Sequence, residues 1–370
     1  MSIRLISLAG VAGLLTSGAA LAEVPQVAAD IAPVHSLVAQ VMGDLGEPAL
    51  VVQHGASPHS YALRPSEARA LQDADAIFWI GEELEPWLED AMANLAPDAE
   101  TVTLIDADGT ETMEFRQGAT FEAHDHSHGG HDHGAHDHDH EGHDHDHDHD
   151  HDHEGHDHEG HDHEGHEHAG HDHDHEGHDH DHEGRDHAGH DHGGHDHSHD
   201  GVDPHAWLSP DNAKAWLDLI ADELGELDPE NAETYAENAE AGKSEIDAAV
   251  TDAEETLASV SDLRFVVFHD AYQYYETAFG LAAVGAISLS DASDPSPARI
   301  EEVRDTIADL EVTCVFAEPQ FNQGLVRTVA EGTDVATGVI DPLGSDIDLG
   351  AAFYPELIRE VANEIASCTK

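Results

Sequence analysis

The sequence predicts an α/β protein with two lobes, each built on a parallel sheet, joined by one long helix. Short apolar runs alternate with helix-like segments in both halves of the 370-residue chain, which is typical of parallel sheets. Residues 228–260 are rich in Ala, Glu and Asp, which predicts one long, largely solvated helix. A tract of His, Asp, Glu and Gly interrupts the first half, and ordinary globular sequence resumes after it.

The first 22 residues predict a cleaved signal peptide. A basic residue precedes an apolar run at residues 5–15, and Ala20 and Ala22 form a small-residue cleavage site. The apolar run is shorter than the roughly 20 residues that a membrane-spanning helix needs. We therefore expect a mature protein that begins at Glu23, is soluble outside the cytoplasm and does not insert into a membrane.

The first lobe is expected over residues 23–227. Its predicted elements are defined by the period of their apolar residues and by turn-forming residues at their ends. In chain order they are a strand followed by a helix (27–42), a strand (49–55), a helix (64–74), two strands (76–81 and 101–105) and an amphipathic helix after a loop at 202–210.

The tract at residues 124–199 holds 32 of the 37 His of the chain. Its HD, HDHEG and HEG units lack large apolar residues and cannot bury enough surface to offset the conformational entropy of the chain. We predict a disordered insertion over residues 121–200, within a loop of the first lobe. Its many weak imidazole and carboxylate sites could raise the local metal concentration or sense metal sufficiency, or could act as a passive buffer.

The second lobe is expected over residues 261–370, where the α/β pattern returns. In chain order the predicted elements are a strand (263–270), a helix (296–310), two strands (312–321 and 335–341) and a last helix (353–368).

The chain contains two cysteines, Cys314 and Cys368. In an exported protein an even number of cysteines first predicts a disulfide, here between a strand and the last helix. Zinc ligation by this pair is a weaker interpretation, because zinc thiolate sites usually have a close C-x-x-C spacing. Two buried free thiols remain an alternative.

The formal net charge of −67 at pH 7 excludes nucleic acid as a partner, because a polyanion repels phosphates. Acidic residues are abundant outside the His-rich tract as well. This acidity is compatible with a salty habitat, with general solubility and with the attraction of cations.

Three His and one Asp lie in loops or at predicted strand ends. His59 lies in GASPHSYALRPSE, His205 in DPHAWLSP, His269 in VVFHDAYQYYE and Asp341 in VIDPLG. Ligands of open α/β sheets collect where the carboxyl ends of the strands meet. Three imidazole nitrogens and one carboxylate oxygen complete the tetrahedron of a closed zinc site. Each His alone is more typical of a partly buried, hydrogen-bonded side chain, but their shared strand-end settings beside a His-rich tract predict a zinc site from these four residues.

Further polar residues lie beside these motifs. Asp203, Asp270 and Glu318 are candidates to orient imidazoles, because a zinc-bound His usually donates its second N–H to such a partner, and a surface position is an equal alternative for each. His35 and His54 also lie near strand ends, and we expect neither to be a ligand.

Several motifs together resemble a known family. PHSYALRPSE, DPHAWLSP, FHDAYQYYE, FAEPQF and DPLG are similar, in the same order, to motifs of ZnuA-type proteins, the periplasmic zinc-binding components of zinc ABC importers. The resemblance implies a metal ion in the cleft between the lobes, with His59 and His205 from the first lobe and His269 and Asp341 from the second. It also implies a periplasmic monomer that delivers zinc to an inner-membrane ABC permease.

Two further features bear on this resemblance. Many members carry a His-rich acidic loop at this place, and some carry a disulfide in the second lobe, which corresponds to Cys314 and Cys368. Some relatives have an acidic residue directly before the first His, whereas this chain has Pro58 there. The Pro58 side chain cannot supply a ligand.

The donor types favour zinc. Manganese-binding relatives have a carboxylate in place of His269, and manganese prefers oxygen donors. A receptor for manganese or another divalent metal, and a zinc store with inert lobes, are the alternatives. A zinc hydrolase with Asp341 as its base is not favoured, because the chain has no H-E-x-x-H motif. We expect a binding protein and not an enzyme.

Overall fold

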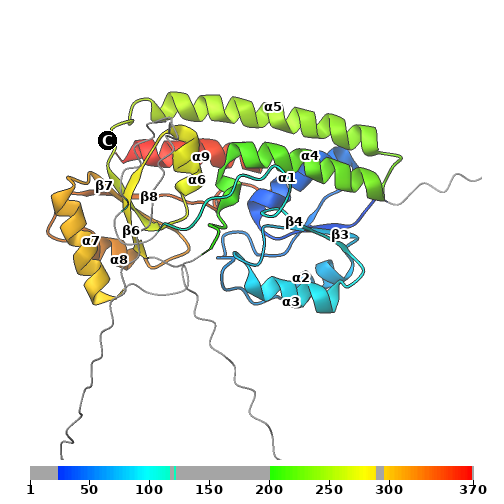
Figure 1. The fold of residues 1–370 in the computed structure, drawn as a ribbon, viewed down its shortest axis with the longest axis horizontal. Helices are drawn as coiled ribbons and strands as arrows, with labels where there is room; N and C mark the ends of the chain where they lie inside the picture. The colour runs from blue at the N-terminus through cyan, green and yellow to red at the C-terminus, as the bar shows by residue number, and fades with distance from the viewer. Residues whose placement is uncertain (1–23, 117–120, 122–200, 289–295, 369–370) are drawn as a thin grey trace, which may run out of the picture. The chain divides into compact units, whose positions relative to one another are not determined.

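The computed structural model describes residues 24–116, 121, 201–288 and 296–368, and it contains two four-stranded sheets in which every strand pairing is parallel (Figure 1). The strand order is β2-β1-β3-β4 in the first sheet and β6-β5-β7-β8 in the second, so the two lobes share one topology. The predicted fold class is confirmed. The predicted signal peptide and nearly all of the predicted insertion lie outside the described residues.

The first lobe contains strands β1–β4 and the helices beside them. The strands are β1 (Val27–Ala29), β2 (Ala49–Leu50), β3 (Ala76–Trp79) and β4 (Glu100–Thr103). The helices are α1 (Ala32–Met42), the 3₁₀ turn η1 (Gly43–Leu45), α2 (Pro65–Gln72), α3 (Pro86–Leu95), the 3₁₀ turn η2 (Ala206–Leu208) and α4 (Pro210–Leu227).

The second lobe follows the long helix α5 (Ala232–Leu257). Its strands are β5 (Phe265–His269), β6 (Ala283–Ser288), β7 (Cys314–Ala317) and β8 (Ala336–Val339). Its helices are α6 (Gln273–Phe279), α7 (Pro297–Asp309), α8 (Gln323–Ala330) and α9 (Phe353–Ser367).

Both sheets are covered on their two faces, which explains why the inner strands β1, β3, β5 and β7 are buried and apolar on both sides. In β5, Val266 and Phe268 face the outer cluster with α7 and α8, whereas Phe265 and Val267 face the central cluster. In the first lobe, α2 and α3 cover the outer face of the sheet and α1 and α4 lie on the other face (Figure 1). The result is a helix–sheet–helix arrangement in each lobe.

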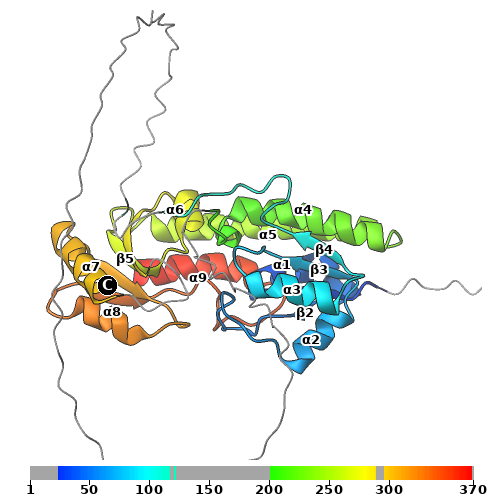
Figure 2. The same ribbon diagram turned by 60° about the horizontal axis from the view of Figure 1, so that its bottom comes forward.

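The long helix α5 has one buried stripe at helical spacing. Tyr235, Ala239, Gly242, Ile246, Ala249, Ala253 and Leu257 are buried, and the other faces are mostly charged or small. This stripe packs on α1, α4 and α9, and both views show α5 running beside α4 and α9 (Figure 2). A Cβ atom at Gly242 would lie 2.5 Å from Gln40 Oε1 and 3.0 Å from Leu217 Cδ1, so α1 and α4 approach α5 closely at this glycine.

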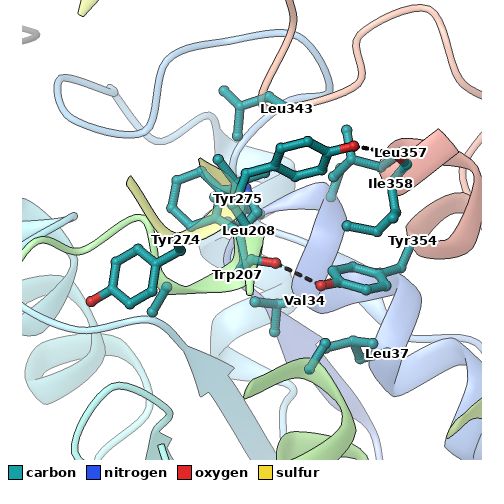
Figure 3. Packing of buried hydrophobic residues seen from close by; sticks show 14 of the residues in the cluster. Val34, Leu37, Trp207, Leu208, Tyr274, Tyr275, Leu343, Tyr354, Leu357 and Ile358 are labelled. Carbon is teal, nitrogen blue, oxygen red and sulfur yellow. Dashed lines mark hydrogen bonds between the residues drawn. The ribbon is translucent and has the colours of Figure 1, made fainter. Parts of the chain in front are cut away.

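One apolar cluster extends through both lobes. Val34 and Leu37 of α1, Trp207 and Leu208 of η2, Tyr274 and Tyr275 of α6, and Tyr354, Leu357 and Ile358 of α9 pack together in it (Figure 3). The buried Tyr hydroxyls have partners, because the Tyr354 hydroxyl donates to Trp207 O (2.7 Å) and the Tyr275 hydroxyl donates to Ile358 O (2.9 Å). The two lobes are therefore joined by a continuous core as well as by α5.

The predicted disulfide between Cys314 and Cys368 is confirmed. It joins the first residue of β7 to the end of α9, with the two Cα atoms 6.1 Å apart. Because α9 packs on α1 and α5, the disulfide connects the second sheet to the shared core.

The structure differs from the predicted elements in two ways. Helices α3, α6 and α8 and strand β6 were not predicted, and β6 is rich in small residues. Strand β2 has only two residues, although the Val51 and Val52 N–H groups continue its ladder to Ala29 O and Asp30 O. Among the described helices, none has the length and apolar character that a bilayer crossing requires.

Two buried carboxyl groups, Asp30 and Glu85, lie beside each other in the first lobe. Both side chains are fully buried, and Asp30 accepts hydrogen bonds from the backbone N–H groups of Ile31 and Ile80. Burial raises the pKa of Asp30 from its ordinary value of 3.8 to about 6. Burial and the charge of Asp30 raise the pKa of Glu85 well above its ordinary value of 4.5.

This pair predicts a loss of stability as pH rises. Both groups release protons more readily in the unfolded chain, so the free energy of unfolding falls once the pH passes their ordinary pKa values, and the Asp30 contribution is lost by about pH 6. Glu85→Gln keeps the size and shape of the side chain and removes one of the two ionisable groups. We expect its free energy of unfolding, measured with chelator present, to fall less between pH 5 and pH 8 than that of the wild type, by an amount on the order of 1 kcal/mol. Glu82→Gln, at an exposed neighbouring position, is the control, and equal slopes for the two variants would contradict the assignment.

Candidate metal centre

The candidate ligands come from loops at the carboxyl ends of both sheets. His269 is the last residue of β5, His59 lies between β2 and α2, and His205 directly precedes η2 on the path that follows β4. Because each lobe presents the carboxyl ends of its strands to the same region, residues far apart in sequence meet there.

The structure brings the three predicted imidazoles together. Each of His59, His205 and His269 offers a ring nitrogen, and these nitrogens lie within 4.8 Å of one another. The Nε2 atoms of His205 and His269 are 3.4 Å apart. Two nitrogens bound to one tetrahedral zinc ion at about 2.05 Å are separated by about 3.3 Å, so this pair has the spacing that zinc requires.

The space between the rings is small. The cavity lined by the three imidazoles leaves about 10 Å³ for the centre of a water-sized sphere, about the room that one water molecule or one ion needs. His205 and His269 are 2% and 4% exposed, whereas His59 is only partly buried. An ion in this cavity is therefore nearly enclosed and has its most open side at His59.

Buried carboxylates fix two of the rings. Asp203 Oδ1 lies 2.7 Å from His205 Nδ1, and Glu318 Oε1 lies 2.7 Å from His269 Nδ1. Because a carboxylate only accepts hydrogen bonds, each ring donates from Nδ1, and the neutral ring then directs the lone pair of Nε2 into the cavity. Asp203 and Glu318 thus have the orienting role predicted from the sequence, in the arrangement usual for zinc-bound histidines.

The loop that carries His59 is held at the preceding residue. Trp87, in the first turn of α3, donates from its indole Nε1 to Pro58 O at 2.8 Å. Tyr61 packs beside Trp87 and donates from its hydroxyl to Glu67 Oε1 (2.8 Å). Trp87 was not singled out in the sequence, because its contact with Pro58 is non-local and a lone Trp is usually a core residue.

Asp341 follows β8 as expected, but it is not part of the three-imidazole cluster. Its carboxylate accepts from Gln320 Nε2 (2.8 Å), Leu343 N (3.0 Å), Ser345 N (2.7 Å) and the Ser345 hydroxyl. These four donors occupy the lone pairs of both oxygens. Asp341 reaches the cavity wall through Gln320, which lines the cavity, and through the loop of Pro342 and Leu343.

The two remaining His outside the tract have other partners. His35 is buried, with Nε2 3.0 Å from Pro48 O, and burial lowers its pKa. His54 Nε2 lies 2.9 Å from Gly344 O and so joins the loop after β2 to the loop after β8. Neither belongs to the cluster of three imidazoles.

The third candidate for orienting an imidazole, Asp270, has a different partner. Arg116 forms hydrogen bonds to both Asp270 and Glu276, and all three side chains are nearly buried. Burial alone would lower the pKa of the Arg116 guanidinium, but the two carboxylates outweigh it and the pKa lies above its ordinary value. The Phe121 ring lies 3.8 Å from Arg116 Cζ.

Arg116 therefore fastens the segment after β4 onto the end of β5, next to His269. The same segment pairs with the chain just before His205, since Glu114 bridges Val202 and the Asp203 N–H donates to Met113 O (2.8 Å). Sequence reasoning missed Arg116. The chain has only 13 Lys and Arg against 80 Asp and Glu, so a lone Arg directly before the His-rich tract was a usable signal.

The fold and the site define a metal-binding protein in which two α/β lobes enclose one small imidazole-lined cavity. Comparison with known proteins identifies its family. The chain belongs to the ZnuA family, described as zinc-uptake complex component A, periplasmic, whose sequence profile matches residues 27–368. Members of this family are solute-binding components, so the hydrolase alternative is set aside and the protein is not an enzyme.

Named relatives agree over nearly the full chain. The high-affinity zinc uptake system protein ZnuA of Brucella abortus (strain 2308) is 43% identical over 361 residues, which cover 98% of this chain and 95% of the relative. The protein of the same name from Paracoccus denitrificans (strain Pd 1222) is 42% identical over 348 residues, 94% of this chain and 92% of the relative. A crystal structure of ZnuA superposes with a TM-score of 0.63 at 20% identity, covering 94% of this chain and all of that one, which supports the fold.

Replacing Arg116 is expected to destabilise the protein. Arg116→Met would leave Asp270 and Glu276 buried without a counter-charge, and removing one partner of a buried ion pair costs about 3–5 kcal/mol. Arg359→Met removes a more exposed pair with Asp252, so we expect a change within about 1 kcal/mol. Urea unfolding of the two metal-free variants measures the free energy of unfolding. A similar decrease in both variants would show that the buried Arg116 ion pairs stabilise the protein no more than an exposed ion pair does.

Proposed function

We propose that the protein captures a zinc ion between His59, His205 and His269 in the periplasm and delivers it to an inner-membrane ABC permease. The observation that supports this most strongly is the 3.4 Å spacing of the Nε2 atoms of His205 and His269, which fits two ligands on one tetrahedral zinc. The family membership and the zinc-uptake names of relatives more than 40% identical support the same function.

The donor set supports zinc over manganese as the captured ion. Three neutral imidazoles suit zinc, whereas manganese favours carboxylate, carbonyl and water oxygens. The carboxylates of Asp203 and Glu318 contribute negative charge behind the rings without occupying coordination positions. Asp341 is proposed as the fourth residue of the site, connected to the cavity through its hydrogen bond with Gln320.

Capture begins with a hydrated ion that exchanges water for imidazole nitrogen. The partly buried His59 is proposed to bind the ion first, at the open side of the cavity. His205 and His269 are already oriented for binding before the ion arrives. The protein is proposed to act as a monomer, with the two lobes presenting the loaded site to the permease.

The domain division of the sequence remains part of the proposal. Residues 1–22 are proposed to be removed on export, and residues 121–200 to form an insertion in the first lobe that supplies zinc to the cavity. The described chain on either side of this segment, at Arg116 and Val202, is anchored close to His269 and His205. Zinc released by the insertion would therefore leave it near the cavity.

Removing one imidazole of the cluster should weaken the tightest zinc site. We expect His205→Ala and His269→Ala each to lower zinc affinity by about a hundredfold or more, which exceeds the 10–100-fold typical of losing an orienting partner. Competition with a chelator strong enough to keep the weak tract sites empty measures this affinity. His54→Gln, a His outside the cluster, should bind as the wild type does. If all three variants bind equally well, the lobes are inert and the protein is a zinc store.

Deleting residues 122–200 should leave the tightest zinc site unchanged. Phe121 is kept because its ring contacts Arg116 and its N–H donates to Val284 O at 3.0 Å. Isothermal titration with zinc should then show one tight site and the loss of many weaker ones. Loss of the tight site together with the weak ones would place it in the tract instead of between the lobes.

A further inference from the structure

Three side chains that line the cavity, His205, His269 and Gln320, are each hydrogen-bonded to a carboxylate. Asp203 lies behind His205 and Glu318 behind His269, each at 2.7 Å from the Nδ1 atom. Asp341 accepts a hydrogen bond from Gln320 Nε2 at 2.8 Å in the same manner. Gln320 lines the cavity with the three imidazoles, whereas Asp341 does not.

The orientation of the Gln320 amide follows from this contact. A carboxylate that already accepts from Leu343, Ser345 N and the Ser345 hydroxyl takes the NH₂ side of the amide. The amide oxygen, Oε1, therefore faces away from Asp341. Oε1 is buried and has no hydrogen-bond partner among the described residues. A buried acceptor without a donor is unfavourable, and such groups in native proteins usually serve a ligand or an ion.

The backbone around Gln320 is held on both sides. Glu318, two residues earlier, is fixed by His269, and the Phe321 N–H donates to Glu318 O in a turn. The Phe321 ring stacks on Phe268 and packs against His269, with centroids 4.8 Å and 5.2 Å apart. Gln320 is thus positioned by the same turn that orients His269.

We propose that Gln320 Oε1 is the fourth donor to the captured zinc ion, and that Asp341 acts through Gln320 as a positioning residue. This inference rests on the proposed function, because it assigns the oxygen position of the site formed by the three imidazoles. Three nitrogens and one amide oxygen make an uncharged ligand set. The negative charge lies on Asp203, Glu318 and Asp341, which are hydrogen-bonded to these ligands. Amide carbonyl oxygens are established metal ligands in proteins.

The test uses the full chain, stripped of metal and loaded with less than one equivalent of Co²⁺, so that the tightest site fills first. If Gln320 occupies the fourth position, azide should not change the visible spectrum of the wild type. Gln320→Ala and Gln320→Leu open that position to water, so their spectra should become sensitive to azide. Their zinc affinity, measured by chelator competition, should fall about tenfold. Gln323→Leu, at an exposed position three residues away, is the matched control and should behave as the wild type.

Asp341→Asn separates the positioning role from direct ligation. If Asp341 acts through Gln320, Asp341→Asn weakens zinc binding in the wild type but adds little in the Gln320→Ala background. An additive loss would show that Asp341 binds the ion itself and would overturn the proposal. An azide-sensitive wild-type spectrum would overturn it in favour of water.

A failure of the Gln320 assignment can be distinguished from a failure of the proposed function. If His269→Ala lowers zinc affinity while both Gln320 variants keep wild-type affinity and azide insensitivity, the three-imidazole site stands and the Gln320 assignment fails. If His269→Ala has no effect, the proposed function fails first.

Discussion

The metal centre depends on holding two imidazole nitrogens as close together as two ligands of one zinc ion. His205 Nε2 and His269 Nε2 lie 3.4 Å apart, and two neutral rings that carry their hydrogens on Nδ1 would direct both Nε2 lone pairs at the same small space, which a low-dielectric interior disfavours. Asp203 and Glu318 oppose this by accepting the Nδ1 hydrogens, and both carboxylates are themselves buried. Carboxylates, rings and backbone must therefore be fixed together, which only a rigid surrounding can achieve.

The shared apolar core provides that surrounding. Tyr274 donates from its hydroxyl to Asp203 O and accepts from the Met113 N–H, so α6 holds the chain on both sides of the insertion. Trp207, two residues after His205, donates from its indole to Pro342 O and contacts Tyr354 of α9 through its own carbonyl. The resemblance assigned His205 to the first lobe, but the residues beside it are held by the second lobe, since Asp203 O accepts from the Tyr274 hydroxyl and Trp207 donates to Pro342 O. The loop of His59 is held within the first lobe by the hydrogen bond from Trp87 to Pro58 O.

Local patterns predicted most of the fold. Alternation of apolar runs with helical segments identified seven of the eight strands, because strands buried on both faces are continuously apolar. The exceptions are informative: β6 is rich in small residues, and α6 is a seven-residue helix whose three aromatic residues are typical of strands. Their assignment depends on packing against β5 and η2 and not on propensity.

The sequence by itself determined the chemistry of this protein: which residues can bind zinc, that they follow parallel strands, and that two cysteines are available to join a strand to the last helix. These follow from residue type and local period. Only the tertiary structure decided which side chains pair with one another. Asp341, which looks like a ligand in sequence, is engaged by Gln320, 21 residues earlier, and by its own loop. Arg116 finds its partners 154 and 160 residues later. Such pairings depend on strand order and on burial, since a charged or polar group removed from water must take the nearest complementary partner, and the sequence does not show which one that is.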